Sequence, residues 1–137
     1  MATNLRLPAT AVRRLDTEAD GWLTTVRSDG QPQSSVIWFY SDDGTVWIRS
    51  QPNVGKIANI RHQPRVAFNL NSDGHGAGVV TLEGTAELVD DLPPGVRDEY
   101  IAKYERAIRG GPWTSPEQML ADFSTTIRIT VERARAW

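Results

Sequence analysis

Two Asp-Gly pairs divide residues 21–50 into three stretches that are rich in β-branched and aromatic side chains. The segment reads GWLTTVRSDGQPQSSVIWFYSDDGTVWIRS, with Asp29-Gly30 in the first break and Asp43-Gly44 in the second. Tight hairpin turns favour this pair because glycine adopts positive φ angles without strain. The pattern predicts a three-stranded antiparallel meander, so the chain must fold around an antiparallel sheet.

Three more strands are expected after this meander. They lie in RVAFNLNSDG, in AGVVTLEGTAELVDD and in the closing TTIRITVERARAW, and Gly84 in the second of these is a candidate bend or bulge. Six strands with few helices predict a mainly β (α+β) protein that forms a small closed or half-closed barrel. A length of 137 residues fits one domain, residues 1–137.

Short helices are expected between these strands, after an amphipathic stretch at residues 9–19. One begins with Asn53 as its predicted N-cap and ends before Pro64. A second has apolar residues at helical spacing within 93–110, and a third follows Ser115 as its N-cap.

The composition excludes several classes of function. A net charge of -2 and a pI near 5.6 give no field that would attract nucleic acid or an acidic membrane surface. The absence of cysteine excludes disulfides, thiolate metal sites and cysteine nucleophiles. No apolar run approaches the ~18 residues needed to span a bilayer, and no secretory leader is recognisable. A cytoplasmic protein with small-molecule or protein partners is expected.

The sequence carries none of the common catalytic signatures. G-x-S-x-G, the P-loop and G-x-G-x-x-G are absent, and His62 and His75 have no metal-site spacing. No metal is therefore expected. The glycine-rich segment at residues 74–78 lies between two strands, which favours a hairpin connection over a phosphate-binding loop.

Lys56 is one of only two lysines, and it stands in the first turn of a predicted helix. A cation there is repelled by the helix dipole, whereas a bound phosphate would offset that repulsion. An anion site and a solvated lysine whose long side chain swings away are equally compatible with the local sequence.

The strand Gln31–Tyr40, QPQSSVIWFY, changes from a polar start to a continuous apolar run. Such a run predicts a strand that is buried on both sides. Ordinary barrel core is the favoured interpretation. The alternative is that its backbone edge and Trp38 form a wall for a flat heteroaromatic ring whose phosphate reaches Lys56.

Three of these segments together resemble a known family. They are GWLTTVRSDGQPQSSVIWF, VWIRSQPNVGKIANIRHQPRV and VTLEGTAELV. They resemble the pyridoxamine 5′-phosphate oxidase-like, FMN-binding split β-barrel superfamily and, within it, the short actinobacterial enzymes that use the deazaflavin coenzyme F420. The resemblance covers roughly residues 5 to 135.

The resemblance implies a homodimer with two flavin-type cofactor sites at the subunit interface. Ser35, Val36, Ile37 and Trp38 are then expected to line the ring. The phosphate region falls to Ser50, Gln51, Gly55 and Lys56, with support from Asn59 one helical turn further on.

Departures from the FMN-binding relatives favour F420 as the cofactor. Those relatives have arginine where this chain has Ser35, and often a second basic residue where it has Gly55. A lone lysine suits the single negative charge of the F420 phosphodiester better than a phosphate dianion. Arg49, Arg61 and Arg65 are candidates for the carboxylates of the F420 tail. The chain ends RARAW and lacks the Arg-x-His element of the true oxidase, which argues against oxidation of vitamin B6.

The implied reaction is hydride transfer from reduced F420 to an electron-poor small molecule such as an activated alkene, enone or imine. No residue is an obvious catalytic acid: Tyr40, His75, Tyr104 and solvent are the candidates. Trp113 either covers the ring across the dimer interface or packs at its own helix junction. An FMN-dependent oxidoreductase and a non-catalytic F420 or small-ligand binding protein are the alternatives.

Overall fold

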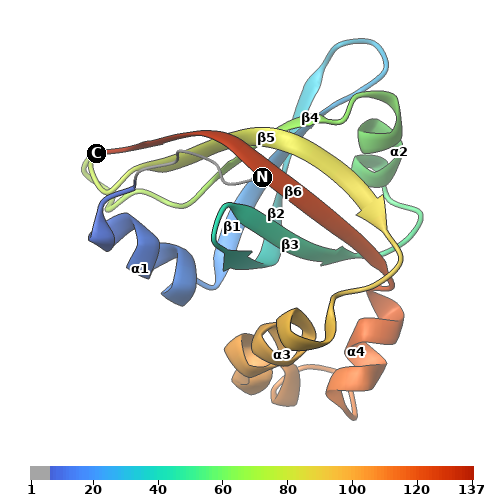
Figure 1. Ribbon diagram of the computed structural model, residues 1–137. Helices are drawn as coiled ribbons and strands as arrows, with labels where there is room; N and C mark the ends of the chain where they lie inside the picture. The colour runs from blue at the N-terminus through green and yellow to red at the C-terminus, as the bar shows by residue number, and fades with distance from the viewer. Residues whose placement is uncertain (1–6) are drawn as a thin grey trace.

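Residues 7–137 form a closed antiparallel barrel of six strands with four helices outside it (Figure 1). A computed structural model describes residues 7–137. The strands are β1 (Asp20–Val26), β2 (Pro32–Asp42), β3 (Thr45–Ser50), β4 (Arg65–Asn69), β5 (Val80–Val89) and β6 (Thr125–Ala136). Around the barrel they follow the order β1-β2-β3-β6-β5-β4. The predicted meander and the mainly β barrel are therefore confirmed.

The two Asp-Gly pairs form the turns that the sequence predicts. Gly30 has a φ of 91°, and Asp43 and Gly44 have φ angles of 41° and 88°. At Asp43-Gly44 the consecutive positive φ angles match the two-residue turn that connects adjacent antiparallel strands with the correct twist. Between β1 and β2 only Gly30 is positive, and its N–H donates to the Arg27 carbonyl oxygen within a longer loop. The chain therefore reverses between β1 and β2 and between β2 and β3.

Gly84 produces the predicted bulge in β5. The register of β5 against β6 shifts between Glu83 and Gly84. A Cβ atom at Gly84 would lie 2.2 Å from the carbonyl oxygen of Thr130, closer than any real contact. Only glycine allows β6 to approach this closely, and the bulge lets these two long strands curve around the barrel.

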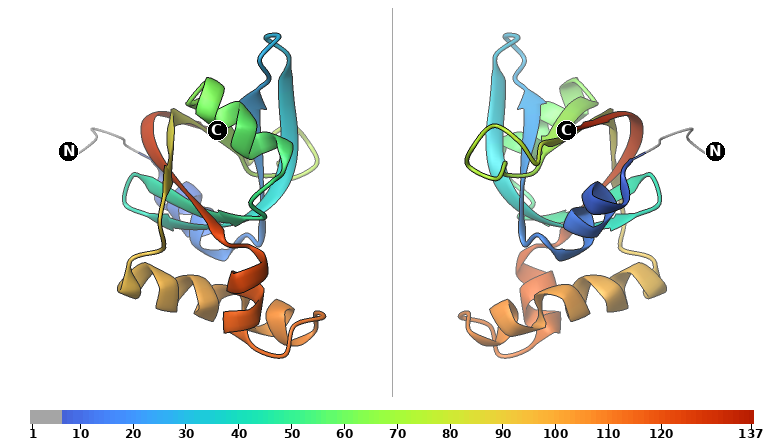
Figure 2. Two further views of the ribbon diagram at one scale, coloured as in Figure 1. Left: turned by 90° about the vertical axis from the view of Figure 1, so that its right-hand side faces the viewer. Right: turned by 90° about the vertical axis from the view of Figure 1, so that its left-hand side faces the viewer.

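The helices are α1 (Ala9–Thr17), α2 (Gly55–His62), α3 (Pro94–Arg109) and α4 (Pro116–Asp122). Figures 1 and 2 show α3 and α4 as a layer below the barrel, whereas α1 and α2 lie beside it at different places. Ser115 caps α4 as predicted, because its hydroxyl accepts a hydrogen bond from the Gln118 N–H. None of the helices in the described part of the chain is long and apolar enough to cross a membrane.

The predicted cap of α2 is wrong. Val54 occupies the N-cap position, and no side chain among residues 7–137 caps this helix. Asn53 lies in the preceding turn, one residue too early for its side chain to reach the first free N–H groups of the helix. The helix therefore starts at Gly55 with uncapped backbone donors.

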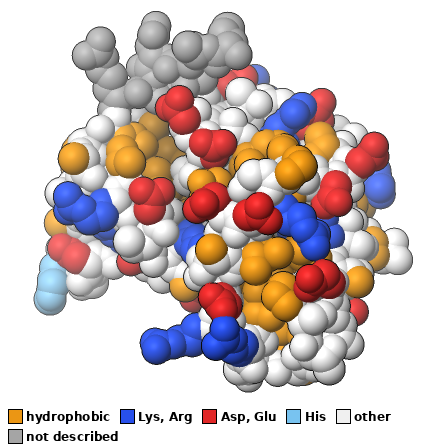
Figure 3. Space-filling model, turned by 60° about the horizontal axis from the view of Figure 1, so that its bottom comes forward, with side chains coloured by type: hydrophobic (Ala, Val, Ile, Leu, Met, Phe, Trp, Pro, Cys, Tyr) orange, Lys and Arg blue, Asp and Glu red, His pale blue; other side chains and the backbone are white. Residues whose placement is uncertain are grey.

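Two hydrophobic clusters lie on opposite sides of the sheet. The first fills the barrel and includes Leu23, Phe39 and Ile48, each fully buried. The second lies between the outer surface of β2 and β3 and helices α3 and α4, and it includes Trp47 and Tyr100. The face that carries α3 and α4 mixes apolar side chains with both signs of charge (Figure 3).

The strand Gln31–Tyr40 is not buried on both sides as predicted. Its side chains alternate: Ile37 and Phe39 point into the barrel and are buried, whereas Val36 is 52% exposed. Trp38 and Tyr40 are half-buried because α3 covers only that part of the outer surface. The apolar run thus supplies one buried face and one partly open face.

Candidate functional site

A cleft opens where β2 leaves β3. β2 pairs with β1 from Pro32 to Trp38, but it pairs with β3 only from Phe39 to Asp42. Beyond Ile48, β3 continues along β6 alone. One backbone edge of residues 33–38 therefore has no partner strand in the described structure, and its N–H and C=O groups are free for a ligand.

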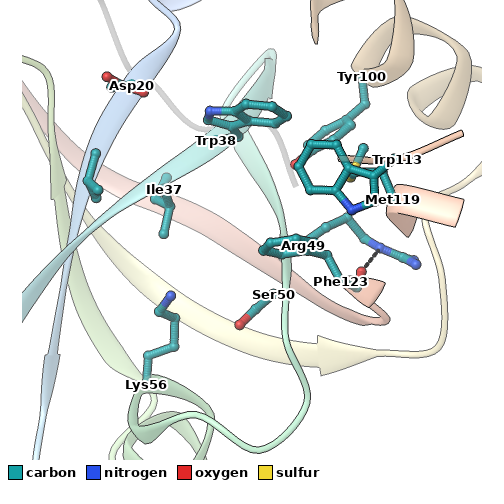
Figure 4. A pocket seen from close by; sticks show the side chains of 11 residues that line it. Asp20, Ile37, Trp38, Arg49, Ser50, Lys56, Tyr100, Trp113, Met119 and Phe123 are labelled. Atoms are coloured by element: carbon teal, nitrogen blue, oxygen red, sulfur yellow. Dashed lines mark hydrogen bonds between the residues drawn. The ribbon is translucent and has the colours of Figure 1, made fainter. Parts of the chain in front are cut away.

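The first cavity in this cleft has a volume of about 200 Å³, and we call it the aromatic cavity. Its walls come from β1, β2, β3 and all helices except α1 (Figure 4). The lining residues are Asp20, Val36, Ile37, Trp38, Arg49, Ser50, Lys56, Tyr100, Trp113, Met119 and Phe123. This predominantly apolar lining with a few polar groups is typical of a site for a flat organic ring.

A second cavity, of about 300 Å³, adjoins the start of α2, and we call it the polar cavity. It is lined by Thr25, Gln33, Ser34, Ser35, Val54, Gly55, Lys56 and Asn59. Lys56 borders both cavities, so the two are neighbours. The whole cleft thus has an aromatic end and a hydrophilic end that meet at a single cation.

Lys56 points its amino group toward the aromatic cavity, on the same side as the Ser50 hydroxyl (Figure 4). No carboxylate among residues 7–137 forms an ion pair with it. Partial burial lowers the pKa of the Lys56 amino group, since nothing nearby compensates its charge. An anion in this position would stabilise the protonated lysine and would also accept from the uncapped start of α2.

Gly55 leaves the approach to this cation open. A Cβ atom added at Gly55 would meet no atom within 4 Å, and the residue is exposed. A phosphate group therefore has room beside the helix start. The Lys56 amino group, the uncapped N–H groups at the start of α2 and this free space fit a phosphate that carries one negative charge.

Helix α3 packs against the part of β2 that lines the aromatic cavity. The hydroxyl of Tyr104 accepts from the Phe39 N–H at 2.8 Å and lies 2.9 Å from the Phe39 carbonyl oxygen. The Lys103 amino group donates to the same carbonyl at 2.9 Å. The Tyr104 ring stacks on Trp38 with a centroid separation of 4.5 Å and an interplanar angle of 5°. α3 thereby satisfies the backbone groups of Phe39 that lie beyond the end of β1.

Arg49 does not serve as a free cation, although it lines the aromatic cavity. Its guanidinium donates to the carbonyl oxygens of Phe123 and Leu120 and forms a 2.7 Å ion pair with Asp91. It is only 9% exposed. The predicted contact of Arg49 with cofactor carboxylates is therefore wrong, because this side chain anchors the end of α4 to β3. Arg61 and Arg65 are exposed and line neither cavity.

The other predicted site residues fall into two groups. Those that line the aromatic cavity are Val36, Ile37, Trp38, Ser50 and Lys56, and those that line the polar cavity are Ser35, Gly55, Lys56 and Asn59. Gln51 lines neither of them; its carbonyl oxygen accepts a hydrogen bond from the Ser50 hydroxyl. Residues from β2 and residues from the segment between β3 and α2 thus line the same cleft.

Asn59 is buried and fixes the floor of the polar cavity. Its side-chain amide donates to Thr25 and to Gln33, each at 3.0 Å. These bonds tie α2 to β1 and β2. Asn59 therefore acts first by positioning the helix that carries Lys56.

The three side chains considered as proton donors lie outside the aromatic cavity. Tyr104 is buried, and its hydroxyl is occupied by Phe39 and by the Ala19 carbonyl oxygen. Tyr40 and His75 are not among the lining residues of either cavity. Tyr100 does line the cavity, and the sequence showed it only as an apolar position of a helix.

Trp113 packs at the junction of α3 and α4 in its own chain, as the simpler interpretation predicted. Its indole N–H donates to Asp122, and its ring contacts Phe123 and Trp38 edge to face. It nevertheless lines the aromatic cavity. The helix junction therefore supplies one wall of the site.

The glycine-rich segment at residues 74–78 is a hairpin connection between β4 and β5, as expected. The N–H groups of His75 and Ala77 both donate to the Asp73 carboxylate. An internal anion thus already occupies the donors that a phosphate would need.

The chain matches the model of a known protein family. The family model described as pyridoxamine 5′-phosphate oxidase matches residues 7–137. No curated protein sequence matches the chain significantly.

Several solved structures share the fold. A protein named F420 reductase is 24% identical, with a TM-score of 0.73 over 94% of this chain and 98% of that one. The conserved hypothetical protein Rv2991 from Mycobacterium tuberculosis is 27% identical, with a TM-score of 0.73 over 100% of this chain and 88% of that one. The heme storage protein HutZ from Vibrio cholerae is 19% identical, with a TM-score of 0.71 over 96% of this chain and 95% of that one.

These similarities show that the fold is shared with the solved structures. The match to the family model extends over all the residues that the structure describes. The chain therefore belongs to the pyridoxamine 5′-phosphate oxidase family.

Proposed function

We propose that this protein is an F420-dependent reductase that transfers a hydride to an electron-poor small molecule. When bound, the reduced deazaflavin supplies the hydride. Lys56 carries the proposal. No carboxylate in the described part of the chain pairs with this half-buried cation, which lies between the aromatic cavity and the polar cavity with its room for a phosphate.

The residues present fit a deazaflavin better than FMN. The FMN phosphate is a dianion, whereas the phosphodiester of F420 has one negative charge at the corresponding place. Among residues 7–137, Lys56 is the only basic residue that lines the polar cavity, since Ser35 and Gly55 bring no charge. One lysine and a helix start balance one negative charge, so a dianion would remain partly uncompensated.

Each part of the cleft has a separate task in this proposal. The unpaired edge of residues 35–38 would hydrogen-bond the polar rim of the ring, and Trp38 would limit its position. Ser50 and Lys56 would hold the phosphate, while Asn59 keeps α2 in place. The aromatic walls exclude water from the remaining volume, where an acceptor must lie for direct transfer.

A titration of the purified apoprotein with F420 and with FMN, followed by quenching of tryptophan fluorescence, tests this proposal. F420 is expected to bind in the micromolar range or tighter, and FMN at least tenfold more weakly, because one charge of its phosphate lacks a partner. Preferential binding of FMN would instead support an FMN-dependent oxidoreductase.

Lys56→Ala provides the matched variant. Loss of a charge-assisted hydrogen bond of about 1.5 to 3 kcal/mol predicts roughly 10- to 150-fold weaker binding of F420. Arg61→Ala removes the same charge from the same helix at an exposed position outside both cavities, and it should leave the affinity unchanged. Equal affinities of the two variants would assign Lys56 to the solvated surface.

Turnover distinguishes an enzyme from a binding protein. Reduced F420 bound to the protein should be oxidised when enones, activated alkenes or imines are added. Tight binding with no oxidation by any acceptor class would favour a protein that sequesters the cofactor.

We also propose that the protein forms a homodimer through the outer surface of β1 and β2. Trp22 and Val36 face each other across these strands, and both are exposed, by 37% and 52%. Neighbouring exposed apolar side chains on the surface of a sheet are typical of protein contacts. Light scattering after gel filtration should give twice the chain mass, and Trp22→Glu should halve it. Val12→Glu, at a 47% exposed apolar position on α1, is the control.

A further inference from the structure

The ladder of hydrogen bonds between β2 and β3 stops where the aromatic cavity begins. Its last pair is Phe39 and Ile48. The next residues along the two strands are Trp38 and Arg49, and both line the aromatic cavity. These two residues are not paired in the described structure, although each of their strands continues past this point. The feature that ends the ladder here therefore keeps the cavity open.

The backbone of Arg49 faces β2. The Gly44 carbonyl oxygen accepts a hydrogen bond from the Val131 N–H, so the backbone groups of Gly44 point toward β6. Successive residues of an antiparallel strand point their N–H and C=O groups to opposite sides. Ile48 therefore also points toward β6, and Arg49 points toward β2. The Arg49 N–H needs a partner on the side of the cleft.

The backbone of Trp38 faces β3. The Phe39 N–H donates in the opposite direction, to the Tyr104 hydroxyl beyond the end of β1. By the same alternation, the N–H and C=O groups of Trp38 point toward β3. Trp38 and Arg49 thus have the orientation of a hydrogen-bonded pair, in which each N–H would donate to the carbonyl oxygen of the other. Two hydrogen bonds are missing at the position where the strands separate.

The Tyr100 hydroxyl stands at the place of this missing pair. The side chain extends from α3 toward the space between Trp38 and Trp113 (Figure 4), and it is 1% exposed. Burial raises the pKa of the Tyr100 hydroxyl, and a hydrogen bond from the Arg49 backbone opposes that rise. A bond that lowers the pKa of a hydroxyl is one that its oxygen accepts. The Arg49 N–H therefore donates to Tyr100 in place of the Trp38 carbonyl oxygen.

Tyr104, one helical turn further along α3, has the same role at the opposite edge of β2. Its hydroxyl lies between the Phe39 N–H and the Ala19 carbonyl oxygen, just beyond the last pair of β1 and β2, Asp20 and Trp38. Residues four apart lie on the same side of a helix. One face of α3 thus ends two ladders with two tyrosine hydroxyls.

We propose that Tyr100 is a positioning residue that keeps the aromatic cavity open, because its hydroxyl holds the Arg49 N–H away from the Trp38 carbonyl oxygen. β2 and β3 then separate one pair earlier than the directions of their backbone groups require. The effect on cofactor binding rests on the proposed function, whereas the effect on the strands does not depend on any ligand.

Tyr100→Phe removes the acceptor and keeps the aromatic ring. The Arg49 N–H then faces only the Trp38 carbonyl oxygen across the cleft, and we expect these two residues to pair. NMR spectroscopy of the ¹⁵N- and ¹³C-labelled apoprotein detects the pair as a coupling through the hydrogen bond, between the Arg49 amide nitrogen and the Trp38 carbonyl carbon. The coupling is expected in Tyr100→Phe and not in the wild type.

The affinity for F420 measures the effect on the cavity. The two hydrogen bonds of the new pair must break before a flat ring can enter between the strands. At the usual net strength of a hydrogen bond, Tyr100→Phe should bind F420 roughly 5- to 150-fold more weakly than the wild type. Tyr40→Phe is the matched control, because it loses a hydroxyl from β2 outside both cavities. It should leave the affinity unchanged.

Tyr104→Phe separates positioning from a general loss of stability. It removes a hydroxyl from the same face of α3, but at the other edge of β2. Its urea midpoint should fall further than that of Tyr100→Phe, because only in Tyr100→Phe does the donor gain a new acceptor. It should show no coupling between Arg49 and Trp38. A coupling of equal size in both variants would mean that loosening of α3 closes the cleft, and it would refute a specific role of Tyr100.

Hydrogen exchange in the wild-type apoprotein needs no variant. The Arg49 N–H, bonded to a buried hydroxyl, should exchange at least tenfold more slowly than the Trp38 N–H, which lacks a partner strand. Equal exchange rates of the two amides, or a coupling between Arg49 and Trp38 in the wild type, would contradict the proposal.

The remaining outcomes separate this proposal from the proposed function. Absence of the coupling in folded Tyr100→Phe overturns the role of Tyr100, whatever the affinity of the variant. A coupling without weaker binding of F420 shows that the pair does not control the cavity, which also overturns it. Failure of F420 to bind the wild type refutes the proposed function alone, because the coupling and the exchange rates are measured on the apoprotein.

Discussion

Tyr104→Phe tests whether α3 supports the wall of the cleft. The substitution keeps the ring that stacks on Trp38 and removes only the hydroxyl. That hydroxyl accepts from the Phe39 N–H at 2.8 Å and lies 2.7 Å from the Ala19 carbonyl oxygen. Phe39 is fully buried, so no water can replace the lost partner of its N–H.

The expected cost follows from the groups that lose a partner. The Phe39 N–H becomes an unpaired buried donor, and Ala19 loses one hydrogen bond. The Phe39 carbonyl oxygen keeps its bond to Lys103. At about 1 to 3 kcal/mol for an unpaired buried group, the free energy of unfolding should fall by about 2 to 4 kcal/mol.

Urea unfolding followed by tryptophan fluorescence measures this difference. The midpoint should shift to lower urea while the slope stays unchanged, because the surface exposed on unfolding is the same. Tyr40→Phe, at a half-buried position on the same strand as Phe39, should cost less than about 0.5 kcal/mol. A loss below about 1 kcal/mol for Tyr104→Phe would refute the view that this hydroxyl replaces a missing strand partner.

Three further predictions concern other parts of the fold. Burial lowers the pKa of Lys103 from 10.5 to about 8. Between these two pH values the unfolded chain binds a proton that the folded protein lacks, so the free energy of unfolding should rise with pH. The expected rise is about 1 to 2 kcal/mol after allowance for solvent screening. Urea titrations at pH 8 and pH 10 should show this rise in the wild type and not in Lys103→Met. Gly84→Ala places a Cβ atom against the Thr130 carbonyl oxygen, so it should lower the melting temperature and reduce the free energy of unfolding by roughly 3 kcal/mol or more. Gly95→Ala is the control, because a Cβ atom there meets open space in α3, and it should be neutral or slightly stabilising in the same thermal melts. Arg49→Gln should cost about 3 kcal/mol in urea unfolding and speed hydrogen exchange in α4, and unchanged exchange would mean that this arginine does not anchor the helix.

Local sequence patterns predicted much of the fold. The two Asp-Gly turns, the cap at Ser115 and the bulge at Gly84 each depend on a residue and its immediate neighbours, so sequence alone identified them. The cap of α2 failed because one residue of displacement, decided by the preceding turn, removes Asn53 from the helix start.

The burial of the strand Gln31–Tyr40 depended on partners that a linear pattern does not contain. A continuous apolar run is compatible with two buried faces or with one. α3 covers the outer surface of β2 only near Trp38 and Tyr40, and this placement left Val36 exposed.

For the candidate site, the sequence by itself determined which residues cluster around Lys56, because a strand end and a helix start bring Ser50, Gly55 and Lys56 together within a few residues. Only the tertiary structure decided that Arg49 is committed to α4 and that Tyr100 borders the aromatic cavity. Arginine and tyrosine look alike in a sequence whether they bind a ligand or a backbone carbonyl. Their roles depend on which distant segment packs against them, and that is fixed only when the helices after β5 fold back over β2 and β3.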